Sequence, residues 1–148
     1  MTDTPKHTYR DANGDLWFRE SLSEGIGNGL RIDKLLYAEA SDVQDLIVFE
    51  NTENGRVLAI DGLVQVSMAD EFIYHEMVSH VPLLSHGAVK RVLIVGGGDG
   101  GAMREMLKHT GVESITLVEI DPDVIEFSKK WFPDVSQGSF DDPRVNVV

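Results

Sequence analysis

Two hydrophobic periodicities divide the chain near Ser67. Before this point, short apolar and β-branched runs predict strands at 16–18, 30–38, 45–50, 56–60 and 63–66. The pairs Asn54-Gly55 and Asp61-Gly62 between such runs are strong hairpin signals. We therefore expect one small antiparallel sheet here, preceded by a loose polar arm over residues 1–14.

A helix is predicted after this sheet. The residues from Ser67 to Asp70 fit a capping box with Asp in the reciprocal place, so the helix should cover 70–81. Pro82 has no backbone N–H and should end it. The expected core residues of the helix are Phe72, Ile73, Met77, Val78 and Val81.

Strands and helices alternate in the remaining sequence. The apolar runs 91–95 and 114–118 are typical of strands covered on both faces of a parallel sheet, and 144–148 begins a third. Helices are predicted over 102–109 and from Pro122 to just before Pro133. This order is the first half of a doubly wound fold.

The predicted fold class is thus α/β, with a small N-terminal antiparallel β domain (1–68) and an incomplete Rossmann-like domain (69–148). The third strand would leave a bare apolar edge, which native sheets avoid. We therefore expect the chain to be truncated or to be completed by another chain.

Composition narrows the class of partner. The net charge is −12, which disfavours nucleic acid and tolerates cationic ligands. The absence of cysteine excludes disulfides, thiolate zinc sites and Cys nucleophiles. No apolar run approaches the roughly 18 residues of a membrane span, and the first residues lack the apolar stretch of a signal peptide. We expect a cytoplasmic protein with no membrane partner.

A glycine-rich loop is the main candidate for chemistry. Gly96, Gly98 and Gly101 satisfy G-x-G-x-x-G between a predicted strand and a predicted helix. Glu119 ends the next strand, where an acid accepts hydrogen bonds from ribose hydroxyls. This context favours a nucleoside ligand over a plain tight turn.

Asp99 selects among nucleoside ligands. A pyrophosphate about 4 Å from its carboxylate would be opposed by roughly 4 kcal/mol at an effective dielectric of 20. A cationic ligand of the S-adenosylmethionine type would be attracted, so we favour that class over NAD. The alternative is a solvated loop acid or a favourable charge at a helix N-terminus.

The histidines of the predicted helix do not form a metal site. His75 and His80 are five residues apart, which places them roughly 140° apart around a helix. They cannot chelate one zinc ion together, and we expect no metal. By residue type alone, His75 is more typical of a packed residue than of a ligand, and Tyr74 of a core residue.

Several blocks together resemble the polyamine aminopropyltransferases, the spermidine synthases above all. The segment 93–101, followed by Arg104 and Glu105, is similar to the glycine loop of that family. Four further blocks match in the same order, at residues 44–50, 58–65, 70–77 and 112–121.

The resemblance implies a fold of the class I methyltransferase type and transfer of an aminopropyl group. Decarboxylated S-adenosylmethionine would be the donor and co-substrate, with no other cofactor, and putrescine the acceptor. Spermidine and methylthioadenosine would be the products. The full-length protein would be a homodimer or homotetramer.

The resemblance also implies residue roles. It assigns contacts with the nucleoside to Gln44 and Glu119, the latter on the ribose, beside Gly96 and Gly98 of the loop. It places Asp99 and His75 on the aminopropyl and polyamine side. Tyr74 and Gln65 match residues near the acceptor amine, and Tyr74 could assist catalysis.

One departure from the family concerns catalysis. The general-base aspartate of the family follows the fourth strand, and an Asp-Gly or Asp-Ala pair that contacts adenine follows the third. The sequence ends at Val148, before both, so we assign no catalytic residue and expect no turnover by residues 1–148 alone. Residues 67–69 also differ from the Thr-Glu-Arg-like run that is usual in the family.

Three other functions remain open at this point. A methyltransferase of the same fold is one, and a non-catalytic nucleoside-binding half that pairs with another chain is the second. An NAD-dependent enzyme is the third. The acceptor polyamine is open too, because the residues that select it lie mostly beyond Val148.

Overall fold

The computed structural model describes residues 4–148 and divides the chain into two compact units. Unit 1 is Met1–Asp70 and unit 2 is Glu71–Val148. Among the described residues, no helix is both long enough and apolar enough to cross a membrane.

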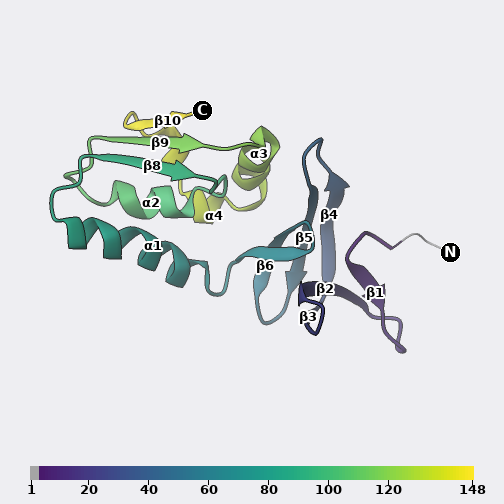
Figure 1. Ribbon diagram of the computed structural model, residues 1–148. Coiled ribbons are helices and arrows are strands. Elements are labelled where there is room, and N and C mark those ends of the chain that lie inside the picture. Colours follow the sequence, from purple (N-terminus) through teal and green to yellow (C-terminus); the bar gives the residue numbers. More distant parts are fainter. Residues whose placement is uncertain (1–3) are drawn as a thin grey trace. The chain divides into compact units, whose positions relative to one another are not determined.

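Unit 1 contains two antiparallel sheets rather than the single sheet that was predicted (Figure 1). The first consists of β1 (Thr8–Arg10), β2 (Leu16–Ser23) and β3 (Ile26–Arg31). The second consists of β4 (Lys34–Ala40), β5 (Asp45–Asn51), β6 (Gly55–Ile60) and β7 (Leu63–Ser67). Neighbouring strands in each sheet follow one another in sequence, as expected for hairpins.

Two predictions for unit 1 were wrong. Residues Thr8–Arg10 of the expected loose arm pair with β2. The single strand expected around 30–38 is interrupted at Ile32, because this side chain is buried in the core while the chain passes from one sheet to the other. The carboxylate of Asp33 then accepts hydrogen bonds from the amide and hydroxyl of Thr52, which fixes the crossing.

The core of unit 1 is apolar. Its buried residues are Phe18, Ile32, Ile47, Phe49, Val57 and Ala59. The rings of Phe18 and Phe49, one from each sheet, have centroids 5.5 Å apart. This core joins the two sheets.

Unit 2 has the predicted order of strands and helices. It comprises α1 (Glu71–His86), β8 (Arg91–Val95), α2 (Gly101–Leu107), β9 (Ser114–Val118), α3 (Pro122–Trp131), α4 (Pro133–Ser136), the 3-10 turn η1 (Ser139–Asp141) and β10 (Val145–Val147). The strands are parallel in the order β10-β9-β8, which confirms half of a doubly wound sheet. Helix α2 lies along β8, and α1 packs against α2 (Figure 1).

The start predicted for α1 is confirmed to within one residue, whereas its predicted cap and its predicted end were wrong. The helix begins at Glu71, and the hydroxyl of Ser67 donates to the carbonyl of Asn54 instead of capping it. The helix also continues past Pro82 to His86. Pro82 is exposed, whereas Leu83 is buried in the core of unit 2, so packing outweighs the missing hydrogen bond.

The buried face of α1 is not the predicted apolar one. The exposed side chains include Phe72, Ile73, Met77, Val78 and Val81, all expected in the core. His75, Ser79 and Leu83 are buried instead, at helical spacing. In β8, Leu93 and Val95 are exposed, so this strand is not covered on both faces within the described residues. Unit 2 therefore has polar side chains in its interior.

Candidate functional site

The glycine loop between β8 and α2 requires glycine for its backbone at three positions. Gly96, Gly97 and Gly100 have φ values of 72°, 112° and 77°, a left-handed region that other residues rarely adopt. The amide of Gly96 donates to the carbonyl of Val118 at 2.9 Å. The loop is thereby fixed at the carboxyl ends of the parallel strands, where ligands bind in open α/β sheets.

Gly98 and Gly101 are required because a side chain would not fit at either position. A Cβ at Gly98 would lie 2.9 Å from Cγ1 of Val124 and 3.1 Å from Oε2 of Glu119. A Cβ at Gly101 would collide with the imidazole ring of His75. The fingerprint thus allows α1 and α3 to approach the loop closely.

Glu119 lies beside the loop, as predicted for an acid at the end of β9. Its Oε2 accepts a hydrogen bond from the amide of Gly98 at 3.0 Å, and its Oε1 accepts one from the amide of Asp121 at 3.2 Å. A carboxylate has about four lone-pair sites, so two further acceptor positions are available for hydroxyl groups.

Asp99 presents only one of its two oxygens to the protein. Its Oδ1 accepts a hydrogen bond from the amide of Gly101 at 2.6 Å and lies 3.2 Å from Nε2 of His75. Within the described residues, Oδ2 makes no hydrogen bond. Burial opposes ionisation, but the hydrogen bond and charge of His75 keep the pKa of the Asp99 carboxyl below its ordinary 3.8. Oδ2 is therefore an anionic acceptor.

His75 lies between two carboxylates. Its Nδ1 is 2.5 Å from Oε2 of Glu71, and its Nε2 faces Asp99. Burial favours the neutral ring, but hydrogen bonds and charge attraction from Asp99, and then from Glu71, raise the pKa of His75 above its ordinary 6.5. Each ring nitrogen faces a carboxylate oxygen, an arrangement that suits an imidazolium, which donates from both nitrogens.

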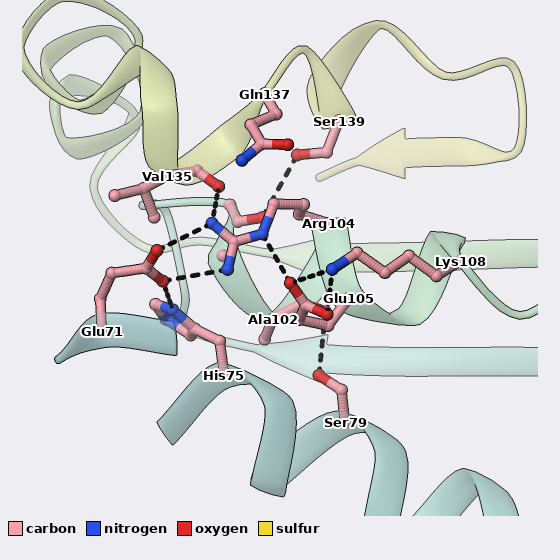
Figure 2. Close-up of polar contacts among 12 residues, drawn as sticks. Glu71, His75, Ser79, Ala102, Arg104, Glu105, Lys108, Val135, Gln137 and Ser139 are labelled. Carbon is pink, nitrogen blue, oxygen red and sulfur yellow. Dashed lines mark hydrogen bonds and ion pairs between the residues drawn. The ribbon is translucent and has the colours of Figure 1, made fainter. Parts of the chain in front are cut away.

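Arg104 of α2 holds Glu71 in place (Figure 2). Its Nη1 and Nη2 donate to Oε1 and Oε2 of Glu71 at 3.0 and 3.1 Å. Its Nε donates to Glu105 at 2.7 Å, and Nη1 also donates to the carbonyl of Val135 at 2.7 Å. Burial opposes ionisation of Glu71, yet Arg104 and then His75 lower the pKa of this carboxyl.

The array ends near the surface beyond Glu105. Lys108 donates to Oε1 of Glu105 at 2.7 Å, and Nε2 of His80 lies 3.0 Å from Oε2. Nδ1 of His80 is in turn 2.8 Å from Nε2 of His109. Oppositely charged groups thus alternate from Asp99 to Lys108.

Sequence reasoning did not predict this array. It included Glu71 and Arg104 only as members of matching blocks and gave them no role. The i, i+4 spacing of Glu71 and His75 indicates that the two can meet on one helix face. The bond between Arg104 and Glu71 spans 33 residues, and no local pattern indicates it.

Three further candidates remain, one in unit 2 and two in unit 1. Tyr74 is 67% exposed, and its ring makes an edge contact with that of His75 at 5.5 Å between centroids. Gln44 and Gln65 belong to unit 1. Gln44 lies in the turn before β5, where its backbone N–H donates to the hydroxyl of Ser41. Gln65 is exposed on β7.

Two family models match the chain. Residues 16–67 match a model described as the spermidine synthase tetramerisation domain, and residues 71–148 match one described as the spermine/spermidine synthase domain. The second match alone covers more than half of the chain.

Curated relatives are similar throughout the chain. A polyamine aminopropyltransferase of Pectobacterium atrosepticum is 57% identical over 134 residues, which are 90% of this chain and 46% of that protein. Polyamine aminopropyltransferase 1 of Pseudomonas aeruginosa is 53% identical over 131 residues, 88% of this chain and 46% of that protein. The chain thus spans about half the length of the curated relatives it matches.

Solved structures agree in fold. Spermidine synthase from Thermotoga maritima matches with a TM-score of 0.85 and 44% identity, over 89% of this chain and 47% of that one. A spermidine synthase in complex with the transition state analogue AdoDATO matches with a TM-score of 0.86 and 41% identity, over 98% of this chain and 50% of that one.

Proposed function

The chain belongs to the spermine/spermidine synthase family, and we propose that its protein transfers an aminopropyl group from decarboxylated S-adenosylmethionine to putrescine. The observation that supports this most directly is the anionic Oδ2 of Asp99, which lies beside a nucleoside-type glycine loop and makes no hydrogen bond within the described residues. Such a site attracts a ligand that combines a ribose with cationic groups and repels a pyrophosphate. It favours this donor over NAD.

In the proposed reaction, the nitrogen of a neutral putrescine amine attacks the carbon next to the sulfonium. The carbon–sulfur bond breaks, methylthioadenosine leaves with the electron pair, and the new secondary ammonium releases a proton to water to give the secondary amine. The carbon is already activated, so the main task is to hold both reactants in line, an effect of up to about 7–11 kcal/mol.

Each candidate residue has a place in this proposal. Glu119 binds the ribose hydroxyls with its free acceptor positions, and Gln44 contributes to binding the nucleoside. Asp99 binds the aminopropyl ammonium through Oδ2, and His75 orients it. Tyr74 and Gln65 serve the acceptor amine.

We also propose that the protein is a homodimer or homotetramer that acts in the cytoplasm on small molecules. A match to a tetramerisation domain over residues 16–67 supports the oligomer. The absence of cysteine suits a reducing compartment.

The test compares a charged ligand with an uncharged one. Calorimetry would measure binding of decarboxylated S-adenosylmethionine and methylthioadenosine to the protein, with the segments that follow Val148, and to its Asp99→Asn variant. We expect the variant to bind the cationic donor about 10- to 100-fold more weakly, with methylthioadenosine little changed, since one charge-assisted hydrogen bond is lost. Glu126→Gln removes an exposed charge on α3 and is the matched control. Equal weakening of both ligands would contradict the role of Asp99, and failure of wild type to bind either would contradict the proposed function.

A further inference from the structure

The proposed reaction assigns no role to Glu71. Its side chain is 9% exposed, and it contacts His75 and Arg104. We propose that Glu71 is a positioning residue that offsets the charge of His75, so that Asp99 keeps a net negative charge for the amine of its ligand. This inference rests on the proposed function, in which that amine binds at Oδ2 of Asp99.

Three charged groups meet at His75: the ring itself and the carboxylates of Asp99 and Glu71. With both ring nitrogens facing carboxylates, His75 is an imidazolium 3.2 Å from the oxygen of Asp99. Alone, these two groups would cancel, and an ammonium would meet a neutral pair with little attraction. The carboxylate of Glu71, 2.5 Å from the other ring nitrogen, restores one net negative charge to the group.

Nε of Arg104 donates to Glu105, whose side chain is only 1% exposed. The other cation on Glu105, Lys108, has a side chain that is 55% exposed and is therefore screened by water, so Glu105 still offsets Arg104. Arg104 therefore does not remove this negative charge. Its bidentate contact with Glu71 instead fixes the carboxylate plane, so that Oε2 stays on Nδ1 of His75 (Figure 2). Arg104 therefore orients Glu71.

Few titratable groups in unit 2 face His75. On its own helix these are Glu71 and the ring of Tyr74. In the glycine loop, the titratable group that faces His75 is Asp99. Helix α2 approaches the ring with the backbone of Gly101. Arg104 acts on the ring through Glu71.

Glu71→Gln separates charge from shape. The amide can donate to Nδ1 of His75 while its oxygen accepts from Arg104, so a neutral His75 can still donate from Nε2 to Asp99. Because one of the two carboxylates that raise the pKa of His75 is lost, the ring should titrate at a lower pH than in wild type.

The measurement is the ratio of the two affinities, decarboxylated S-adenosylmethionine over methylthioadenosine, by calorimetry from pH 5.5 to 8. In wild type we expect the ratio to change by no more than about twofold, because Glu71 offsets the charge that His75 carries when it is protonated. In Glu71→Gln we expect the ratio to fall about tenfold as the pH decreases and His75 takes up its proton, the effect of about one charge-assisted contact. Glu126→Gln should follow wild type.

Three results of this measurement test the role of Glu71 and the proposed function. A decrease in Glu71→Gln that disappears in Glu71→Gln/His75→Asn supports the proposal, since the second substitution removes the titrating ring. Parallel profiles in wild type and Glu71→Gln overturn it, because a merely structural role changes affinity without adding a pH dependence. A wild type that binds neither ligand instead contradicts the proposed function.

A measurement on wild type alone covers the case in which the variant does not fold. Calorimetry at pH 7 in buffers of different ionisation enthalpy counts the protons released when each ligand binds. We expect nearly equal proton release for the cationic donor and for methylthioadenosine, since Glu71 favours the protonated ring in both complexes. A difference of about half a proton or more would overturn the proposal.

Discussion

The interiors of the two units differ in kind. The core of unit 1 is apolar, and the ion pairs among its described residues are at the surface: the side chain of Lys6, which pairs with Asp45, is 73% exposed. Among the described residues, every buried charged side chain lies in unit 2, and these include Arg104 and Glu105. Unit 2 therefore combines an apolar core with a buried charged array.

We expect the apolar interior to contribute mainly to stability and the charged array mainly to ligand binding. Removing paired charges from water is unfavourable, and well-packed apolar residues in their place are often neutral or stabilising. Unit 2 also has an apolar core, which includes Met103, Ile115 and Leu117. The charged array instead reaches Asp99 at the glycine loop, where its effect is on ligands. One tryptophan in each unit, Trp17 and Trp131, allows the two to be followed separately by fluorescence once the other is replaced by Phe.

The largest effect is expected from Arg104→Met. The change leaves Glu71 and Glu105 without their shared partner in a buried place, and unit 2 should lose about 3–5 kcal/mol of unfolding free energy. Urea unfolding followed through Trp131 measures it. The control is Arg31→Met, which breaks an exposed pair with Asp33 in unit 1 and should leave the midpoint of the Trp17 transition unchanged. Equal losses in the two variants would remove the distinction between the units.

Gly101→Ala should have an intermediate effect. The new methyl group collides with the ring of His75, so the loop or α1 must shift, and we expect unit 2 to lose about 1–3 kcal/mol. Weaker binding of decarboxylated S-adenosylmethionine should accompany the loss, because Asp99 accepts the amide of this residue. Gly25→Ala in unit 1 has open space and should change stability by less than about 0.5 kcal/mol. An unchanged affinity in Gly101→Ala would argue against this role of the loop.

The pH dependence of stability should also differ between unit 1 and unit 2. A pKa that changes by 1 on folding changes the free energy of unfolding by about 1.4 kcal/mol. The lowered pKa values of Glu71 and Asp99 stabilise unit 2 above their ordinary 4.5 and 3.8, and this contribution is lost as the pH falls through the folded values. The raised pKa of His75 stabilises unit 2 fully below 6.5, and this contribution is lost as the pH rises through the folded value.

Unit 2 should therefore be most stable between about pH 5 and 6.5, as seen in the Trp131 transition. His75→Gln should remove the decline on the alkaline side. A decline of the same size in that variant would show that another group titrates there.

The smallest effect is expected where the two units are alike. Ile47→Val in unit 1 and Ile115→Val in unit 2 each delete one buried methylene from an apolar core. Both should lower the unfolding free energy by about 0.5–1.5 kcal/mol. Thermal unfolding of each variant, followed through the tryptophan of its own unit, measures this. A much larger loss in unit 2 would mean that its apolar core also depends on the charged array.

The alternation of strands and helices in unit 2, the hairpins of unit 1 and the glycine loop could all be predicted from the sequence. These features depend on local spacing: period-two and continuous apolar runs, and glycines where the chain turns. The close approach of Glu119 to Gly98 also followed, because both lie at the carboxyl ends of neighbouring parallel strands.

Only the tertiary structure decided which face of α1 is buried and how Asp99 is connected. The apolar residues Phe72 and Met77 suggested the wrong face, because periodicity cannot show that a polar stripe has partners. Arg104 supplies them from 33 residues away and makes burial of Glu71 and His75 possible. Whether a charged side chain can be buried depends on the charge opposite it, and in this protein that charge comes from a distant part of the chain.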